Sequence, residues 1–236
     1  MSPRRRMSAS SPFRPMLRPA PTVAFDCERW VIGFGSYEGN RRRSFVASVL
    51  KGIRRFMKIG VIVTGLPASG KTTVARDIAK HLGLEFLDKD DFLEGLYERF
   101  GVRSWDDRDW LSRQSDQAFI DVAIRLNSAV LVSHWRSPGD RSESGTPSDW
   151  VAQEYKKIVE VCCLCSPKIA HVRFLARNRH PGHLDKKNDP NELAQRMEKW
   201  ASRFPLGVGT LVEVQTEREL DTVSLIDDIL GALSSN

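Results

Sequence analysis

The chain has 236 residues, of which 41% are hydrophobic and 28% are charged, and its formal net charge is +6. These values fit one globular domain of ordinary size, and no apolar run approaches the roughly 20 residues that a membrane-spanning helix needs. The positive charge is unevenly placed: residues 1–56 hold twelve Lys or Arg against three Asp or Glu, whereas residues 57–236 hold 24 against 27. A uniformly basic face for nucleic acid is therefore not indicated.

Residues 1–56 form an N-terminal extension rich in Arg, Pro and Ser. Such a composition buries too little apolar surface to offset the entropy of ordering, so we predict disorder. Three interpretations stay open: a dispensable extension ahead of a functional start at Met57, an organelle transit peptide, or a basic contact arm. We expect a cytoplasmic protein, or organelle import if the extension is a transit peptide.

Three of the four cysteines, Cys162, Cys163 and Cys165, lie in one apolar stretch. Cys163 and Cys165 would point to the same face of a strand, and no second cysteine pair completes a zinc site. We interpret them as small buried residues, and reduced thiols favour a reducing compartment.

Residues 65–73 read GLPASGKTT, which satisfies the phosphate-binding pattern GxxxxGK(S/T) in full. The glycines let successive backbone N–H groups face inward at a helix N-terminus, where they bind an anion. Lys71 would reach the β- and γ-phosphates, and the Thr72 hydroxyl would bind Mg²⁺. The predicted loop that binds a nucleoside triphosphate comprises Gly65, Leu66, Pro67, Ala68, Ser69, Gly70, Lys71, Thr72 and Thr73.

The flanking segments give this loop its expected context. The run KIGVIVTG (58–65) has the length and β-branched character of a buried parallel strand. Apolar residues then follow at helical spacing from Val74 to Leu82, and Gly83 is a typical helix end. Strand, glycine-rich turn and helix is the order that a phosphate-binding loop requires.

A second strand is predicted at 84–87, followed by the acidic stretch DKDD (88–91). An extended backbone would send the side chains of Asp88 and Asp90 to the same side. Asp88 could then support Mg²⁺, and Asp90 could accept the proton of an attacking hydroxyl. The alternative is that Asp90 or Asp91 only caps the following helix.

These residues, GLPASGKTT followed by LEFLDKDDF, resemble the small P-loop kinases of the shikimate and gluconate kinase type. The wider group includes zeta toxins and chloramphenicol phosphotransferase. The resemblance extends weakly over residues 58–230 and implies an α/β fold in which a five-stranded parallel sheet of order 2-3-1-4-5 lies between helices. It divides residues 57–236 into a kinase domain with an acceptor lobe at about 90–128 and a lid at about 178–190.

The resemblance also implies roles for arginines. Arg173 and Arg177 lie four residues apart, so a helix would place both guanidinium groups near one phosphate region, although a solvated basic face is the alternative. Arg177 and Arg179 would bind ATP, and Lys71, Asp90, Arg173 and Arg177 would act in catalysis. His180 and His183 are expected to make lid contacts or to be exposed.

Two segments are less typical of the group. Residues 129–135 match the third strand of the group, but Ser133 and His134 at its end lack a carboxylate, so Mg²⁺ support must come from Asp88 or elsewhere. Residues 104–129 predict a long helix in the region where the resemblance implies an acceptor lobe. Trp105, Asp109, Arg113 and Gln117 could face the acceptor, and the alternative is core packing for Trp105 and solvent exposure for the other three.

The leading hypothesis is an ATP- and Mg²⁺-dependent phosphotransferase that acts on a hydroxyl of a small polar metabolite or antibiotic. A polynucleotide or RNA 5′-hydroxyl kinase, with the basic extension gripping phosphates, is a second hypothesis. A nucleotide-binding regulatory NTPase is a third, although no base-recognition motif of the GTPase kind is present. The expected partner is a small-molecule acceptor, with no membrane contact and an undetermined oligomeric state.

Overall fold

The computed structural model describes residues 57–141 and 145–235, so our predictions for residues 1–56 lie outside the described residues. Five parallel strands form one sheet in the order β2-β3-β1-β4-β5, as the resemblance implied. The strands are β1 (Ile59–Gly65), β2 (Glu85–Asp88), β3 (Ser128–Val132), β4 (Lys157–Leu164) and β5 (Thr210–Gln215).

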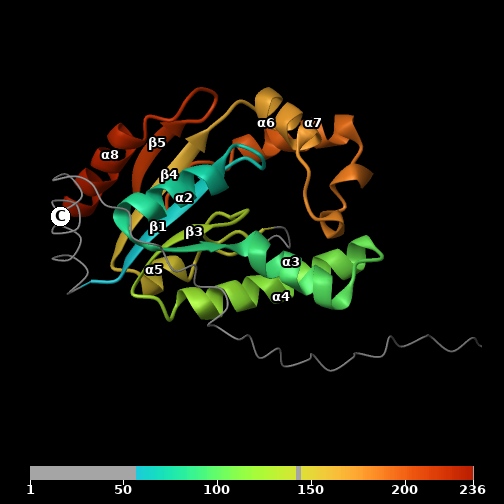
Figure 1. Ribbon diagram of the computed structural model, residues 1–236, viewed down its shortest axis with the longest axis horizontal. Coiled ribbons are helices and arrows are strands. Elements are labelled where there is room, and N and C mark those ends of the chain that lie inside the picture. The colour runs from blue at the N-terminus through green and yellow to red at the C-terminus, as the bar shows by residue number, and fades with distance from the viewer. Residues whose placement is uncertain (1–56, 142–144, 236) are drawn as a thin grey trace, which may run out of the picture.

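The helices alternate with the strands and lie on both faces of the sheet (Figure 1). They are α2 (Lys71–Leu82), α3 (Lys89–Phe100), α4 (Trp105–Ala123), α5 (Val151–Glu154), α6 (Pro167–Ala176), α7 (Pro190–Ala201) and α8 (Thr222–Ser234). Two short 3₁₀ turns, η2 (Pro181–His183) and η3 (Asp185–Lys187), lie between α6 and α7. The predicted α/β fold with a five-stranded parallel sheet is confirmed.

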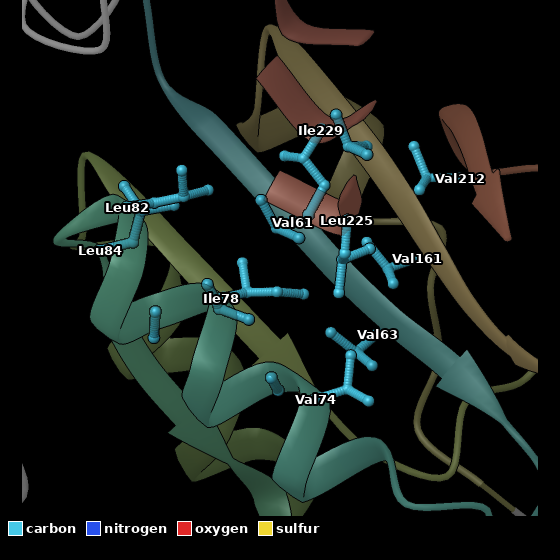
Figure 2. Close-up of a cluster of buried hydrophobic side chains, with 14 of the residues drawn as sticks. Val61, Val63, Val74, Ile78, Leu82, Leu84, Val161, Val212, Leu225 and Ile229 are labelled. Atoms are coloured by element: carbon cyan, nitrogen blue, oxygen red, sulfur yellow. The ribbon is translucent and has the colours of Figure 1, made fainter. Parts of the chain in front are cut away.

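Strand β1 is the centre of the core, and all seven of its residues are buried. Alternate side chains point to opposite faces of a strand. Val61 and Val63 pack with α2 and α8, as Figure 2 shows, whereas Ile62 packs on the other face with residues of α4 and α5. Apolar residues at consecutive positions are therefore explained by a strand that is covered on both faces.

Because all strands are parallel, their carboxyl ends share one edge of the sheet, and this edge carries the candidate site. Val63 of β1 is in register with Val132 of β3, which is in register with Asp88 of β2. The glycine-rich loop, the acidic stretch and the end of the third strand therefore start from the same level.

Three element boundaries differ from prediction. Helix α3 begins at Lys89, so Asp90 lies in its first turn and the expected extended backbone across 88–90 is wrong. The predicted long helix ends at Ala123, because the chain turns there before it enters β3. Strand β3 ends at Val132, so Ser133 and His134 follow the strand rather than belong to it.

In the parts of the chain that the structure describes, no helix is long and apolar enough to cross a membrane. Cys162 and Cys163 are buried in β4, as predicted, whereas Cys165 is half-buried beyond the strand end.

Candidate active site

The glycine-rich loop has a backbone that only glycine adopts readily at two positions. Gly65 and Gly70 have φ of 129° and 94°, in the region that side chains disfavour. A Cβ on Gly65 would also lie 2.7 Å from the carbonyl oxygen of Cys163 in the neighbouring strand. The loop thus needs glycine at Gly65 for both conformation and space, and the spacing of the motif reflects this.

Lys71 folds back over this loop. Its Nζ donates to the carbonyl oxygens of Gly65 at 3.0 Å and Leu66 at 2.7 Å. Burial lowers the pKa of Lys71 to about 8. An ammonium group that is held only by backbone carbonyl oxygens is well placed to exchange them for phosphate oxygens.

Thr72 and Asp88 form the candidate metal site. The Thr72 hydroxyl donates to Oδ2 of Asp88 at 2.8 Å, and the backbone N–H of Asp90 donates to Oδ1 at 3.0 Å. Asp88 therefore caps α3, a role that we had weighed for Asp90 or Asp91. Burial and the nearby charge of Asp90 raise the pKa of Asp88 to about 7.

This donor set fits Mg²⁺, which prefers oxygen ligands and is commonly held by one or two protein groups together with nucleotide phosphates. No group of three or more His, Cys, Asp or Glu able to hold a metal occurs within residues 57–141 and 145–235. The hydroxyl and carboxylate next to the phosphate loop would therefore share the ion with the nucleotide rather than enclose it alone.

Asp90 is paired across the site with Arg179, which lies in the segment 178–190 that the resemblance implied to be a lid, and the Asp90 side chain is about half exposed. Partial burial opposes the charge of Asp90, but Arg179 and the other cations nearby outweigh this and lower its pKa. Arg179 also lies 3.7 Å from Asp185, which accepts from Arg177 at 3.0 Å. One chain of alternating charges thus joins the start of α3 to the lid.

The lid itself packs down on α3. His183 is buried, and its Nε2 lies 2.8 Å from Oε1 of Glu94. Burial and the charge of Arg179 lower the pKa of His183 to about 3, so a neutral ring donates this hydrogen bond. The ring of Tyr97 stacks on His180 and meets His183 edge-on. Of the two alternatives that we considered for His180 and His183, the structure therefore shows contacts rather than exposure.

The two arginines of the sixth helix do not share a face. Helix α6 ends at Ala176, and Arg177 has an extended backbone. Arg173 donates to the carbonyl oxygen of Thr216 at 2.8 Å, while Arg177 turns to Asp185. The expectation of two guanidinium groups on one helix face is therefore wrong. Arg177 nevertheless lies close enough to Lys71 for its charge to lower the pKa of that lysine.

Sequence reasoning missed a buried polar network behind the acidic stretch. Lys89 donates to Ser112 at 2.7 Å and lies 3.3 Å from Asp116. Asp116 accepts from Thr146 at 2.6 Å, and Thr146 lies 2.5 Å from the Ser133 hydroxyl. The one signal of this network in the sequence is the spacing of four between Ser112 and Asp116 in α4, because its other members are far apart in sequence.

The four residues of α4 that we considered for acceptor binding are all exposed. Trp105 is 43% exposed, and Gln117 bonds to Asp121 on the exposed side of the helix. Asp109 pairs with its neighbour Arg108, and Arg113 is exposed. The inward face of α4 carries Ser112 and Asp116 instead.

Fold and site together define a P-loop nucleotide-binding protein of the kinase type. A family model described as an AAA domain (AAA_18) matches residues 61–198, more than half of the chain, and the chain belongs to this family. The resemblance to P-loop kinases, inferred from the phosphate loop and the acidic stretch, is confirmed.

Individual relatives agree with this class. A shikimate kinase of Paracidovorax citrulli is 37% identical over 65 residues, 28% of this chain and 32% of that protein. A cytidylate kinase of Ignicoccus hospitalis is 30% identical over 98 residues, 42% of this chain and 53% of that protein. The chain thus spans only about a third to a half of the length of these curated relatives.

A solved structure shows the same fold over most of the domain. A kinase candidate of Chloroflexus aurantiacus has a TM-score of 0.60 and 24% identity. The match covers 75% of this chain and 98% of that one.

Proposed function

We propose that this protein is an ATP- and Mg²⁺-dependent phosphotransferase that moves the γ-phosphate to a hydroxyl of a small polar metabolite. The observation that carries the proposal is the meeting of three parts at one sheet edge. These parts are the half-buried Lys71, the Thr72–Asp88 pair and the Asp90–Arg179 pair.

The nucleotide would bind on the β1 side of this edge. The inward N–H groups of residues 65–73 would hold its phosphates, and Lys71 would leave its carbonyl partners for phosphate oxygens. Mg²⁺, held by Thr72 and Asp88, would neutralise charge that develops on the phosphates. Arg173, on the β5 side, contacts Thr216, whose Cβ lies 3.8 Å from a Cβ built on Gly70.

The acceptor would bind on the β2 side, between α3 and the lid. Asp90 keeps its charge because its pKa is lowered, so it can orient a hydroxyl and take up the proton released as transfer completes. Arg179 now occupies one oxygen of Asp90 and would turn to the transferring phosphoryl group when the acceptor hydroxyl takes that place. Arg177, joined to it through Asp185, would add positive charge.

Little covalent work is required of the protein, because phosphoryl transfer is accelerated mainly by positioning and charge stabilisation. The lid would supply charge stabilisation through Arg177 and Arg179. Its closure would also exclude water that otherwise competes with the acceptor.

The test uses the full chain with Mg²⁺ and γ-labelled ATP, offered pooled sugars, sugar acids, nucleosides, antibiotics and 5′-hydroxyl oligonucleotides. We expect label to move to a small molecule and to stay in ATP with Lys71→Ala. A Lys80→Ala control, on the exposed side of α2, should behave as the parent protein.

Other outcomes point to the two other hypotheses. Label that moves only to oligonucleotides would favour a polynucleotide kinase. Tight ATP binding with no transfer to any acceptor would favour a regulatory NTPase, and absence of nucleotide binding would overturn all three.

A further inference from the structure

We propose that Lys89 is a positioning residue: its buried ion pair with Asp116 of α4 fixes the start of α3 and so holds Asp88 and Asp90 in place for phosphoryl transfer. This inference rests on the proposed function, because Asp88 and Asp90 carry the chemistry in that proposal.

Lys89 stands between these two carboxylates in the chain and is the first residue of α3. Its side chain is only 9% exposed, whereas the side chain of Asp90 is 47% exposed and pairs with Arg179. Nζ of Lys89 donates to Oγ of Ser112 at 2.7 Å and lies 3.3 Å from Oδ1 of Asp116. A lysine between two residues assigned to the chemistry is thus tied to the next helix rather than to the site.

Asp116 continues this network to the segments that follow β3. Its Oδ1 accepts from Oγ1 of Thr146 at 2.6 Å, and Oγ1 of Thr146 lies 2.5 Å from Oγ of Ser133. The backbone also fixes Thr146, because its N–H donates to the carbonyl oxygen of His134 and its carbonyl oxygen accepts from the N–H of Arg136, both at 2.8 Å. The network therefore joins the start of α3 to α4 and to both sides of the loop after β3.

The apolar contacts between α3 and α4 do not fix the start of α3 in the same way. One apolar cluster joins the later turns of α3 to α4 and comprises Leu93, Leu96, Tyr97 and Leu111. Phe92 meets Phe119 edge-on, with 5.9 Å between ring centroids. Apolar burial is non-directional, so these contacts permit small shifts of one helix along the other. The hydrogen bonds of Lys89 require particular distances and angles, so they specify where the helix begins.

Stability alone does not account for a charged pair at this position. Removing a lysine and an aspartate from water is costly, and replacing a buried ion pair with apolar side chains of similar volume is often neutral or stabilising. The pair therefore contributes direction more than stability. Direction matters here, because Asp88 must meet Thr72 while Asp90 must face the acceptor, and a displacement of about 1 Å can slow a reaction about 100-fold.

A charge-free variant separates positioning from stability. Lys89→Met alone leaves Asp116 buried without its counter-charge and should lower the melting temperature by about 10 °C. Lys89→Met combined with Asp116→Leu removes both charges and should melt within about 5 °C of the parent protein. We expect this double variant to lower kcat about 10- to 100-fold while the KM for ATP stays within about threefold. A purely structural network would instead give the parent kcat once stability is restored.

Lys58→Met combined with Glu154→Met is the matched control. Lys58 and Glu154 form another partly buried lysine–carboxylate pair, with 3.2 Å between Nζ and Oε2. Lys58 immediately precedes β1, so this pair lies at the amino end of the strand, away from the site. The control should keep the parent kcat. An equal loss of kcat in the control, or the parent kcat in the charge-free variant, would overturn the inference and leave the phosphotransferase standing.

Hydrogen exchange of the full chain gives a readout that needs no acceptor. In the nucleotide-free protein, the amides of residues 90–93 should exchange about 10-fold faster in the charge-free variant than in the parent, because the start of α3 is no longer held. The control should exchange there as the parent does. Equal exchange in the charge-free variant and the parent would overturn the inference.

Thr146→Val keeps the test decisive if the charge-free variant does not fold. Valine has nearly the shape of threonine but cannot donate to Asp116. This variant should melt within about 5 °C of the parent, lower kcat about 3- to 10-fold and speed exchange of residues 90–93. Parent values of both kcat and exchange would overturn the inference.

Failures of the two proposals can be told apart. If the parent protein binds ATP but transfers label to no acceptor, the proposed function fails, and hydrogen exchange alone decides the inference. Faster exchange of residues 90–93 in the charge-free variant would then support the positioning role, and unchanged exchange would overturn it.

Discussion

The phosphate loop and the lid both contribute residues to the candidate site, but they are held in different ways. The loop is held by backbone conformation, with glycines at 65 and 70 and a lysine that bonds to carbonyl oxygens. The lid is held by side chains that reach α3, such as Arg179 on Asp90 and His183 on Glu94. The backbone of the loop is already in the conformation that binds phosphate, whereas side-chain contacts can be exchanged, so we expect the lid to be the part that opens.

The largest effect should come from the loop. Lys71→Ala removes the one ammonium within it and should lower phosphate transfer about 100- to 1000-fold, the usual loss for a group that stabilises transition-state charge. Single-turnover transfer measures this. Folding should change little, since the lost contacts are two hydrogen bonds to backbone carbonyls, and a melting temperature lowered by more than about 5 °C would show a structural role instead.

One added methyl group at Gly182 should displace the lid from α3. A Cβ on Gly182 would lie 2.5 Å from Cδ2 of Tyr97, so Gly182→Ala should push the lid off α3 at a cost of about 1–3 kcal/mol. Trypsin should then cut between Arg177 and Lys187 several-fold faster. Gly231→Ala in α8, where a Cβ meets open space, should resist cleavage as the parent does and gain about 0.5–1 kcal/mol of stability. Equal cleavage of both variants would show that the lid is not docked.

We expect the charge of Asp88, although needed for function, to lower the stability of the nucleotide-free protein. Its pKa is about 7 when folded and 3.8 when unfolded, so the folded state binds the proton more tightly. Stability is therefore lost through this group as pH rises from about 4 to about 7. In Asp88→Asn, the remaining oxygen can accept from the Asp90 N–H, and the new amide can donate to the Thr72 hydroxyl, which reverses the direction of that hydrogen bond. The variant should stabilise the nucleotide-free protein by about 1–3 kcal/mol at pH 8 and much less at pH 4.

Urea unfolding at the two pH values measures this difference. Asp109→Asn, on an exposed ion pair, serves as control and should change stability by no more than about 0.5 kcal/mol at either pH. A destabilised Asp88→Asn at pH 8 would contradict the assigned burial cost.

The smallest expected effect is the uptake of protons when ATP binds. Burial lowers the pKa of Lys71 to about 8, so about half of the free protein carries a neutral Lys71 at pH 8. ATP phosphates favour the charged form, and binding at pH 8 should take up about half a proton. Calorimetry in buffers of different ionisation enthalpy measures this uptake. The same uptake in Lys71→Ala would assign it to another group.

The contrast between a loop held by its backbone and a lid held by side chains also explains how much could be predicted from the sequence. Gly65, Gly70 and Lys71 were recognised because the backbone geometry that they serve is local and recurs with fixed spacing. Asp88 and Asp90 were found from their place after a strand, although the chain brings them together through a helix turn rather than an extended segment. Strand order followed from resemblance and not from pattern.

Side-chain partners between distant segments could not be predicted. Arg177 was placed on a helix that ends one residue earlier, because no glycine or proline marks that end. Glu160, fully buried in β4, accepts from the backbone N–H groups of Leu206 and Gly207 and so anchors the chain before β5. Such contacts depend on which segments meet, and that is settled by packing of the whole domain.

The central claim is that one edge of the sheet holds ATP and, through Asp90, an acceptor hydroxyl. Asp90→Asn tests it most directly, with ATP binding and single-turnover transfer to the identified acceptor measured on one sample. The account predicts that ATP affinity stays within about threefold while transfer falls about 100-fold or more, because general-base and orienting roles of this kind contribute that much. Transfer at the parent rate would contradict the role of Asp90, and parallel loss of ATP binding would place it on the nucleotide side instead.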